Sequence, residues 1–587
     1  MKQLISRRSF MKAAGVTTAV AAVSLGAPAA SACFPGSVKD ITILYTNDVH
    51  TYIDNKSPKL TYAAIAAMKQ GYVDEGKPVL LVDAGDHIQG TAYGSMDNGA
   101  TIIELMNEAG YDIATLGNHE FDYGMARAKA IIKEADFPYV SCNWVDLRTG
   151  LRVLPAVKLF PAGGKWIAFV GITTPESFTK STPAYFMNAK QTKYIYDILG
   201  GDDGRKLYDA VQKAIDKAKT LGADIIIGLG HLGVDPSSSP WTSEEVIAHT
   251  SGFDAFIDGH SHTVMENKQV QDASGKAVTL TQTGSYFANV GEMTIAADGT
   301  ITTKLIPTHE GMDAGIAAMQ TGWVNTVDDM LGEKIAVGDS DFYVSDPATG
   351  KRRIRSAETN LGDFVADGIY TYFNEVEKLH CDVAIMNGGG IRADVPAGDW
   401  TFKTCKQVSP FGNVACLMSV TGKQIQDALE FAARFAGEDG KENGGFLQVA
   451  GATYEIHTDI PNTVQTDEKN VWIGSATGTP RVQNVKIYDK ASGSYLPLDP
   501  GATYALAGMN YTLRNLGDGF AMFDGAELIK DYVSEDYLVM STYAMTFGGV
   551  DAEGLPHLTT ANSPLADYPG YLLNYEDPYG AGRISIL

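Results

Sequence analysis

Five apolar runs in the first half of the chain share one pattern, and each has the length of a buried strand. Each run ends in glycine or turn residues, followed by a side chain that can bind a metal ion. The runs and these side chains are Ile41–Thr46 before Asp48 and His50, Pro78–Asp83 before Asp86, Tyr111–Leu116 before Asn118 and His119, Ala223–Leu229 before His231, and Phe253–Asp258 before His260 and His262. Helical stretches such as 60–69, 99–109 and 204–219 separate the runs. The pattern predicts a layered α/β domain that binds ligands at the carboxyl ends of its strands.

Histidine is concentrated at these predicted strand ends. One histidine after a strand is usually a hydrogen-bonded loop residue, but five of the chain's 11 histidines follow the five runs. Mixed imidazole and carboxylate ligands suit Mn, Zn, Fe or Co. The set is larger than one ion needs, so we expect two divalent ions that share a bridging carboxylate.

Composition limits the partners of the chain. It has 587 residues, with 46 Lys and Arg against 70 Asp and Glu, and its net charge is −24. This length predicts two or more domains, and the acidic excess argues against binding of a nucleic-acid polymer. An anionic ligand has to be bound by local positive groups, against the net charge of the protein.

The N-terminal 32 residues read as an export signal. Ser6-Arg7-Arg8-Ser9-Phe10-Met11-Lys12 resembles the twin-arginine signal, and an apolar run and a small-residue cleavage site at Ala30-Ser31-Ala32 follow it. The apolar run is too short to span a bilayer comfortably, so we expect no transmembrane span and a periplasmic, cell-surface or secreted location. Cleavage removes four positive charges and leaves a net charge of 42 − 70 = −28. Lipidation of Cys33 is a less favoured alternative, because the large aliphatic residue of a lipoprotein signal is missing.

The remaining cysteines form no C-x-x-C pair, which excludes a cysteine zinc knuckle. We expect them to be buried or bridged, with three pairings open, and they are Cys142, Cys381, Cys405 and Cys416.

The motif series at the strand ends resembles the calcineurin-like metallophosphoesterases. The segment Gly117-Asn118-His119-Glu120-Phe121-Asp122 is typical of their 5'-nucleotidase family, which includes bacterial UDP-sugar hydrolases and ecto-5'-nucleotidase. This resemblance implies a four-layer αββα catalytic domain over residues 39–317, after a signal peptide over 1–32. It also implies a linker and hinge helix over 318–340 and a separate α/β C-terminal domain over 341–587.

The resemblance also assigns metal ligands and catalytic residues. One metal ion would be held by Asp48, His50, Asp86 and His262, and the second by Asp86, Asn118, His231 and His260, with Asp86 bridging. His119 resembles the residue that stabilises the transition state or protonates the leaving oxygen, and Asp122 the one that orients its ring. An aspartate at position 122 favours a nucleotidase, since cyclic-phosphodiesterase relatives often carry asparagine there. We expect His87 to support the site or to face solvent rather than to bind metal.

The C-terminal half carries candidate nucleotide-binding residues. A predicted strand at Cys381–Met386 leads into Asn387-Gly388-Gly389-Gly390-Ile391-Arg392, which resembles the family's substrate-binding motif. Arg355 resembles a second phosphate-contacting arginine, Phe411 resembles one of two aromatic residues that stack on a nucleobase, and Asn413 and Asp518 are candidates for contacts with base and ribose. The second aromatic usually lies six residues before the aspartate of Gly-Asp-Gly. That position is Thr512, so a one-residue insertion would make Tyr511 the stacking partner.

These features favour an exported phosphohydrolase that uses two metal ions and acts on nucleoside 5'-monophosphates, with nucleoside di- and triphosphates and UDP-sugars as further substrates. The alternatives are a 2',3'-cyclic-nucleotide phosphodiesterase and a thiosulfohydrolase of sulfur oxidation. A non-catalytic binding protein on the same scaffold is a third alternative, and it would predict gaps in the ligand series. The series has no gap.

Overall fold

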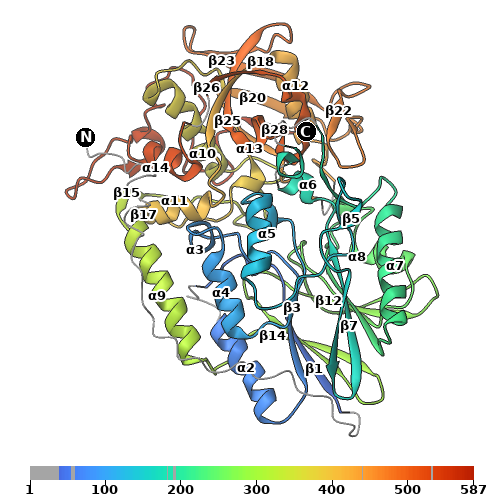
Figure 1. Ribbon diagram of the computed structural model, residues 1–587. Coiled ribbons are helices and arrows are strands. Elements are labelled where there is room, and N and C mark those ends of the chain that lie inside the picture. Colours follow the sequence, from blue (N-terminus) through green and yellow to red (C-terminus); the bar gives the residue numbers. More distant parts are fainter. Residues whose placement is uncertain (1–38, 54–59, 182, 189–192, 439–440, 531–532) are drawn as a thin grey trace.

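The computed structural model describes residues 39–53, 60–181, 183–188, 193–438, 441–530 and 533–587. The predicted export signal and Cys33 lie outside these residues. Figure 1 shows an N-terminal half, coloured blue to green, and a C-terminal half, coloured yellow to red. None of the described helices combines the length and the apolar composition needed to cross a bilayer.

Two mixed sheets form the centre of the N-terminal half. The first has the strand order β14 (Ile301–Ile306), β13 (Val290–Ile295), β1 (Ile41–Thr46), β2 (Val79–Asp83), β3 (Ile113–Ala114). The second has the order β11 (Val264–Gln271), β12 (Ala277–Thr283), β10 (Ala255–Ile257), β9 (Ile225–His231), β7 (Lys165–Thr173), β6 (Val157–Ala162). Strands β1, β2 and β3 run parallel, as do β7, β9, β10 and β12, so their carboxyl ends meet at one edge of each sheet.

Alternate side chains of the central strands enter different cores. In β9, Ile225, Ile227 and Leu229 pack between the two sheets, whereas Ile226 packs against the outer helices. This period of two explains why the strands appear as continuous apolar runs, since both faces of each sheet are covered.

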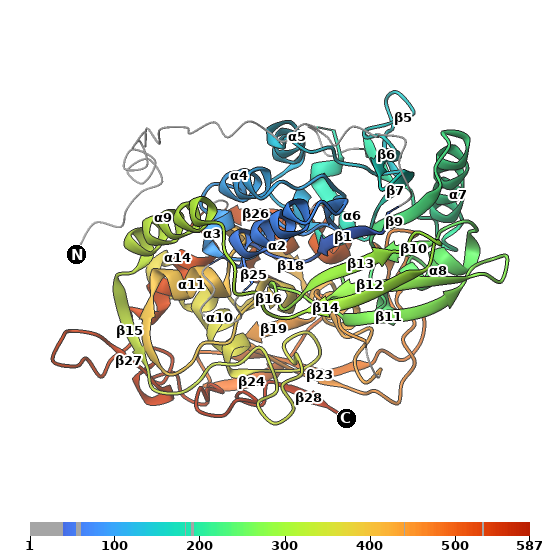
Figure 2. The ribbon, with the colours of Figure 1, turned by 90° about the horizontal axis from the view of Figure 1, so that it is seen from below.

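Helices cover the outer faces of the two sheets. The first sheet is covered by α2 (Tyr62–Asp74), α4 (Ala100–Ala109), α5 (Met125–Glu134) and α9 (Ala314–Leu331), and the second by α7 (Arg205–Thr220) and α8 (Ser243–His249). In Figure 2, α2, α4 and α9 lie together, away from α7 and α8. The predicted αββα arrangement is confirmed.

The C-terminal half has its own α/β core around a five-stranded sheet. The strand order is β19 (Leu447–Ala450), β16 (Val383–Asn387), β25 (Thr503–Met509), β18 (Ala415–Thr421), β26 (Glu527–Lys530). One face packs on α10 (Asn360–Thr371), α11 (Phe402–Val408) and α14 (Asp536–Ala544). The other packs on α12 (Gly422–Ala432) and on a four-stranded sheet of β24 (Ser494–Pro497), β23 (Val482–Asp489), β20 (Ala452–Ile456) and β28 (Ile584–Ile586). A three-stranded sheet joins β17 (Gly398–Thr401), β15 (Lys334–Gly338) and β27 (His557–Leu558).

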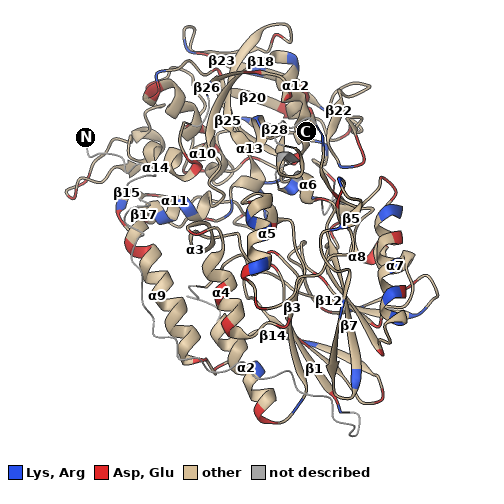
Figure 3. Cartoon of the chain, in the orientation of Figure 1, with Lys and Arg blue, Asp and Glu red and all other residues tan. Residues whose placement is uncertain are grey.

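The two halves meet beside helix α9. Leu331, at its end, belongs to an N-terminal core, whereas Ile335 belongs to a C-terminal one. Lys403 of α11 pairs with Asp328 of α9 at 2.6 Å, where Figure 3 shows a positive helix next to the negative end of another. This contact spans the halves, and the hinge over 318–340 and the other domain limits stay predictions.

Most predicted elements are present with shifted ends. The predicted strand at Tyr111–Leu116 shrinks to β3, whereas the helical stretch predicted over 60–69 corresponds to α2, which spans Tyr62–Asp74. The four described cysteines are buried free thiols, so the bridged alternative is wrong for them.

The buried residue Asp536 holds the loop between α11 and β18, which carries Phe411. The backbone N–H of Asp536 donates to the carbonyl of Asn413 at 2.8 Å, and the Asp536 carboxylate accepts from the Asn413 N–H at 3.1 Å. Lys406 is also buried, with its ammonium 4.6 Å from the ring centre of Tyr537. Burial raises the pKa of Asp536 to about 7, although Lys406 acts in the opposite direction.

We predict that this carboxyl makes the folded protein less stable as the pH rises. The pKa of this carboxyl is higher in the folded than in the unfolded chain. Its contribution to the free energy of unfolding is therefore fully present below about pH 4 and is lost as the pH rises through about 7. Between these pH values the wild type should lose up to about 4 kcal/mol more stability than Asp536→Asn. Urea unfolding monitored in the C-terminal half at several pH values measures this difference.

The matched control is Asp524→Asn, at an exposed position of the same half. It should retain the pH dependence of the wild type. If Asp536→Asn and wild type show the same pH dependence, Asp536 does not carry a raised pKa.

Candidate active site

The loops that follow the central strands have unusual backbone conformations. Five of the predicted metal ligands lie in the left-handed region, with φ between 47° and 80°: Asp48, His50, Asp86, His260 and His262. Residues other than glycine are uncommon in this region, although Asn, Asp and His adopt it more often than the rest, and residues in this conformation cluster at functional sites. Backbone hydrogen bonds hold the loops in place, from Asp48 N–H to Gly85 and from His50 N–H to Asp86, both at 3.0 Å.

Glycines let these loops approach one another closely. A Cβ atom on Gly117 would lie 2.2 Å from Oδ1 of Asp86, and one on Gly259 would lie 2.8 Å from Oδ2 of Asp48. Only glycine fits at such distances. The glycines of the motif series therefore bring the ligand-bearing loops into contact.

The buried carboxylate of Glu120 joins two of the loops. It accepts hydrogen bonds from the backbone N–H groups of Asp86 and His87, both at 2.9 Å, and of Gly117 at 2.7 Å. His87 is buried, and its ring nitrogens lie 2.8 Å from Asp83 and from the hydroxyl of Tyr139. His87 therefore supports this loop, and the alternative that it faces solvent is wrong.

The predicted metal ligands converge at the edge of the two sheets. Nε2 of His231 lies 3.0 Å from Oδ2 of Asp86, and Nε2 of His262 lies 3.4 Å from Oδ1 of Asp48. Three overlapping groups of side chains are each compact enough to hold an ion. Two match the predicted sites, namely Asp48 with His50 and His262, and Asp86 with His231 and His260, and the third combines His50 and Asp86 with His119. The other ring nitrogens of His50 and His231 face backbone carbonyls at 2.8 and 2.7 Å, which orients both rings toward the cluster.

The donor set fits divalent metal ions. Oδ1 of Asn118 is buried and has no hydrogen-bond partner among the described residues, and Nε2 of His231, although 3.0 Å from Oδ2 of Asp86, makes no hydrogen bond of proper geometry. Such atoms are rare in folded proteins, and a bound cation would satisfy both. Burial together with neighbouring His262 lowers the pKa of His50, and burial together with Arg352 lowers that of His262. These rings are neutral and available as ligands for a transition metal.

His119 stands beside this cluster, in the short helix η1 (His119–Phe121). Its Nδ1 lies 2.5 Å from Asp122, and its Nε2 lies 4.0 Å from Asp86. Burial lowers the pKa of His119, but Asp122 and Asp86 outweigh this effect and raise it above the ordinary value. The contact with Asp122 fixes the ring and leaves Nε2 facing the cluster.

One pocket joins the metal cluster to the C-terminal half. From the N-terminal half it is lined by the predicted residues Asp86, Asn118, His119, Asp122, His260 and His262, and from the C-terminal half by Arg355, Asn387, Arg392, Phe411, Asn413, Tyr511 and Asp518. The other predicted ligands, Asp48, His50 and His231, are fully buried beside it. The ring of Phe411 has its centre 5.9 Å from that of His119, so the two halves face each other across this space.

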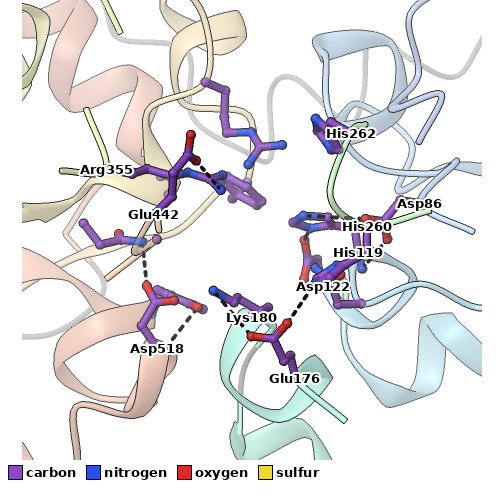
Figure 4. Close-up of a pocket in the computed structure, with 18 of the residues that line it drawn as sticks. Asp86, His119, Asp122, Glu176, Lys180, His260, His262, Arg355, Glu442 and Asp518 are labelled. Carbon is purple, nitrogen blue, oxygen red and sulfur yellow. Dashed lines mark hydrogen bonds and ion pairs between the residues drawn. The ribbon is translucent and has the colours of Figure 1, made fainter. Parts of the chain in front are cut away.

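Positive groups gather on the C-terminal side of the pocket. Burial, Arg352 and Arg392 together lower the pKa of Arg355 to about 9. Glu442 lies 3.1 Å from Arg352 and 3.9 Å from Arg355, and so partly balances their charge (Figure 4). Arg392 places its guanidinium 5.8 Å from the ring centre of Phe411. This cluster gives an anion a positive surface in a protein of net negative charge.

The predicted base and ribose residues lie together in the same pocket. Tyr511 lines the pocket whereas Thr512 does not. This agrees with a one-residue insertion between the second aromatic residue and the aspartate of Gly-Asp-Gly. The Tyr511 hydroxyl accepts a hydrogen bond from the Asp518 N–H at 3.1 Å, and Asn387 donates to the Asp518 carboxylate at 3.0 Å. These bonds fix the side of the pocket opposite His119.

Five charged lining residues are absent from the predicted set, namely Glu176, Lys180, Asp235, Arg352 and Glu442. Arg352 lies in a basic stretch visible in the sequence, and Glu176 follows an apolar run like those before the metal ligands. Burial raises the pKa of Glu176, but Lys180, His260 and Ser238 outweigh it and lower this pKa to about 2. Nothing in the local sequence marks Lys180 or Glu442.

Comparisons with known proteins agree with this architecture. Residues 41–264 match the family model for calcineurin-like phosphoesterases, and residues 335–525 match that for the 5'-nucleotidase C-terminal domain. Residues 4–24 match the twin-arginine translocation pathway signal sequence, which confirms the predicted export.

Relatives match over most of this chain. Human 5'-nucleotidase is 28% identical over 551 residues, which cover 86% of this chain and 88% of that protein. The trifunctional nucleotide phosphoesterase protein YfkN of Bacillus subtilis is 29% identical over 87% of this chain, but the chain spans only about a third (34%) of its length. A crystal structure of a 5'-nucleotidase precursor from Thermus thermophilus has the same fold, with a TM-score of 0.73 and 24% identity over 93% of this chain and 99% of that one. The chain is therefore a 5'-nucleotidase-like metallophosphoesterase and belongs to the 5'-nucleotidase family of calcineurin-like phosphoesterases.

Proposed function

We propose that this protein is an exported 5'-nucleotidase that releases phosphate from nucleoside 5'-monophosphates and requires two divalent metal ions. One observation carries the proposal: a single pocket is lined by four of the seven predicted metal ligands and by all seven predicted nucleotide-binding residues, and each half contributes one wall. A phosphate bound at the cluster would leave its nucleoside facing Phe411 and Tyr511.

In this proposal the cluster would hold two metal ions in two sites. The first is formed by Asp48, His50, Asp86 and His262, and the second by Asp86, Asn118, His231 and His260. Bound there, two cations would supply Lewis acidity and neutralise charge on a phosphoryl group. Mn, Zn, Co and Fe all suit these ligands.

The side chains around the cluster position the substrate and move a proton. Arg355 and Arg392 bind the phosphate oxygens, which their planar guanidinium groups match. His119 holds a proton at Nε2 and donates it to the leaving ester oxygen, while Asp122 keeps the ring in this orientation. Asp518 and Asn387 hold the ribose, Asn413 contacts the base, and Phe411 and Tyr511 stack on it.

A phosphate-release assay with added Mn, Zn or Co tests the reaction. Its substrates are AMP, UMP, ADP, ATP, UDP-glucose, 2',3'-cAMP and a sulfur-linked compound, which together separate this proposal from the alternative enzymes. We expect preference for a 5'-nucleotide, and loss of the activity after dialysis against a chelator.

Removing the proton donor should greatly slow the reaction. His119→Ala should lower kcat for AMP by about 10²- to 10⁴-fold, because proton transfer to the leaving oxygen is lost. His380→Ala, at an exposed position, is the control and should stay within about twofold of wild type. A kcat of wild-type size in His119→Ala would exclude this role.

Removing one stacking ring should weaken nucleotide binding but not the chemistry. Phe411→Ala should raise KM for AMP about 10- to 100-fold and leave kcat nearly unchanged, because stacking on a base contributes about 1–3 kcal/mol. Ribose 5-phosphate, which lacks a base, is the control substrate, and its KM should change little. Equal changes for both substrates would show that Phe411 does not contact the base.

A further inference from the structure

A short segment after strand β7 touches both halves of the molecule. Glu176 lies directly before helix α6 (Ser177–Lys180), which packs against η6 (Gly517–Gly519) of the C-terminal half. In Figure 1, α6 lies at the boundary between the two halves. The ammonium of Lys469, from the C-terminal half, lies 3.9 Å from the ring centre of Phe178 in this helix. Contacts from both halves therefore fix the position of α6.

Glu176 contacts a proposed metal ligand directly. Its Oε2 lies 2.8 Å from Nε2 of His260 and accepts a hydrogen bond from the Ser238 hydroxyl at 2.6 Å. Its side chain is almost fully buried, with 4% exposed, so water does not compete for these bonds. Because the carboxylate occupies Nε2, the nitrogen of His260 left for a metal ion is Nδ1.

The backbone of His260 is also fixed, since its N–H donates to Oδ2 of Asp48 at 2.9 Å. The bond to Asp48 thus restrains the backbone of His260, and the contact with Glu176 fixes the orientation of its ring. A carboxylate on the outer nitrogen of a histidine ligand also makes that ligand more basic.

The second oxygen of the same carboxylate faces Lys180. Oε1 of Glu176 lies 3.8 Å from the ammonium of Lys180, whose side chain lines the pocket. Figure 4 shows Lys180 between Glu176 and Asp518, and therefore between the metal cluster and the nucleoside side. Glu176 is in contact with both a proposed metal ligand and a cation that faces the substrate space.

We propose that Glu176 is a positioning residue for His260, and that Lys180, held by the same carboxylate, is a further cation that binds the sugar–phosphate part of the nucleotide. The second statement rests on the proposed function, whereas the first concerns metal binding alone. In this proposal the side chain of Glu176 positions both the metal ligand His260 and the substrate-binding Lys180.

Metal titration of the metal-free protein tests the role of Glu176. We expect Glu176→Ala to bind one of its Zn²⁺ or Mn²⁺ ions about 10- to 100-fold more weakly in calorimetry. Glu176→Gln should lie between this variant and wild type, because an amide oxygen still accepts the bond from His260. Glu176→Gln also provides the test if Glu176→Ala does not fold.

The matched control is Glu442→Gln, a carboxylate of the same pocket that contacts arginines, and its metal affinity should stay within about twofold of wild type. Thermal unfolding of the metal-free variants separates a positioning effect from general destabilisation. Wild-type metal affinity and stoichiometry in both Glu176 variants would overturn the assignment, as would a loss of affinity matched by Glu442→Gln.

Lys180→Met tests the second role. It should raise KM for AMP about tenfold, the effect of one lost hydrogen bond to a charged group, and retain the metal affinity of the wild type. An unchanged KM would overturn the assignment of Lys180. If the wild type releases no phosphate from nucleotides, the proposed function fails, but the titrations still decide whether Glu176 positions His260.

Discussion

The packing of buried carboxylates and imidazoles at one edge of the two sheets is the constraint on which the rest of the N-terminal half depends. Asp48, Asp86, His50 and His231 are almost inaccessible to solvent, although groups of these types are costly to bury. The surrounding backbone takes strained conformations to bring them together, and Glu120 holds two of the loops in place. The free-energy cost of burying these groups falls at the place where a bound cation would offset it.

The C-terminal half gathers positive charge at the pocket of an acidic protein. The whole chain is strongly acidic, yet Arg352, Arg355 and Arg392 converge on one wall of the pocket. They repel one another, and Glu442 is the carboxylate that lies against two of them. The balance is local: these arginines face the metal cluster of the other half across the pocket.

Sequence predicted the chemistry of this site better than its architecture. Asp86 and His231 were identifiable because parallel strands bring their carboxyl ends to one edge, and the strand signal was strong. The division into two sheets was predicted through the family resemblance alone, since β1 and β9 are both short apolar runs and strand order has no local signature. Glu176 follows such a run but carries no motif. Lys180 and Glu442 gain their roles from contacts across the halves or between distant loops, which no local pattern encodes.

The four buried free thiols bear on the cellular compartment in which the chain can fold. Burial raises the pKa of Cys142 to about 12, so this thiol stays protonated and inert. No disulfide stabilises the described part of the chain, and its folding therefore needs no oxidant. The twin-arginine pathway carries proteins that are already folded. For such a protein, the reducing interior of the cell and the oxidising space outside the membrane permit the same native state.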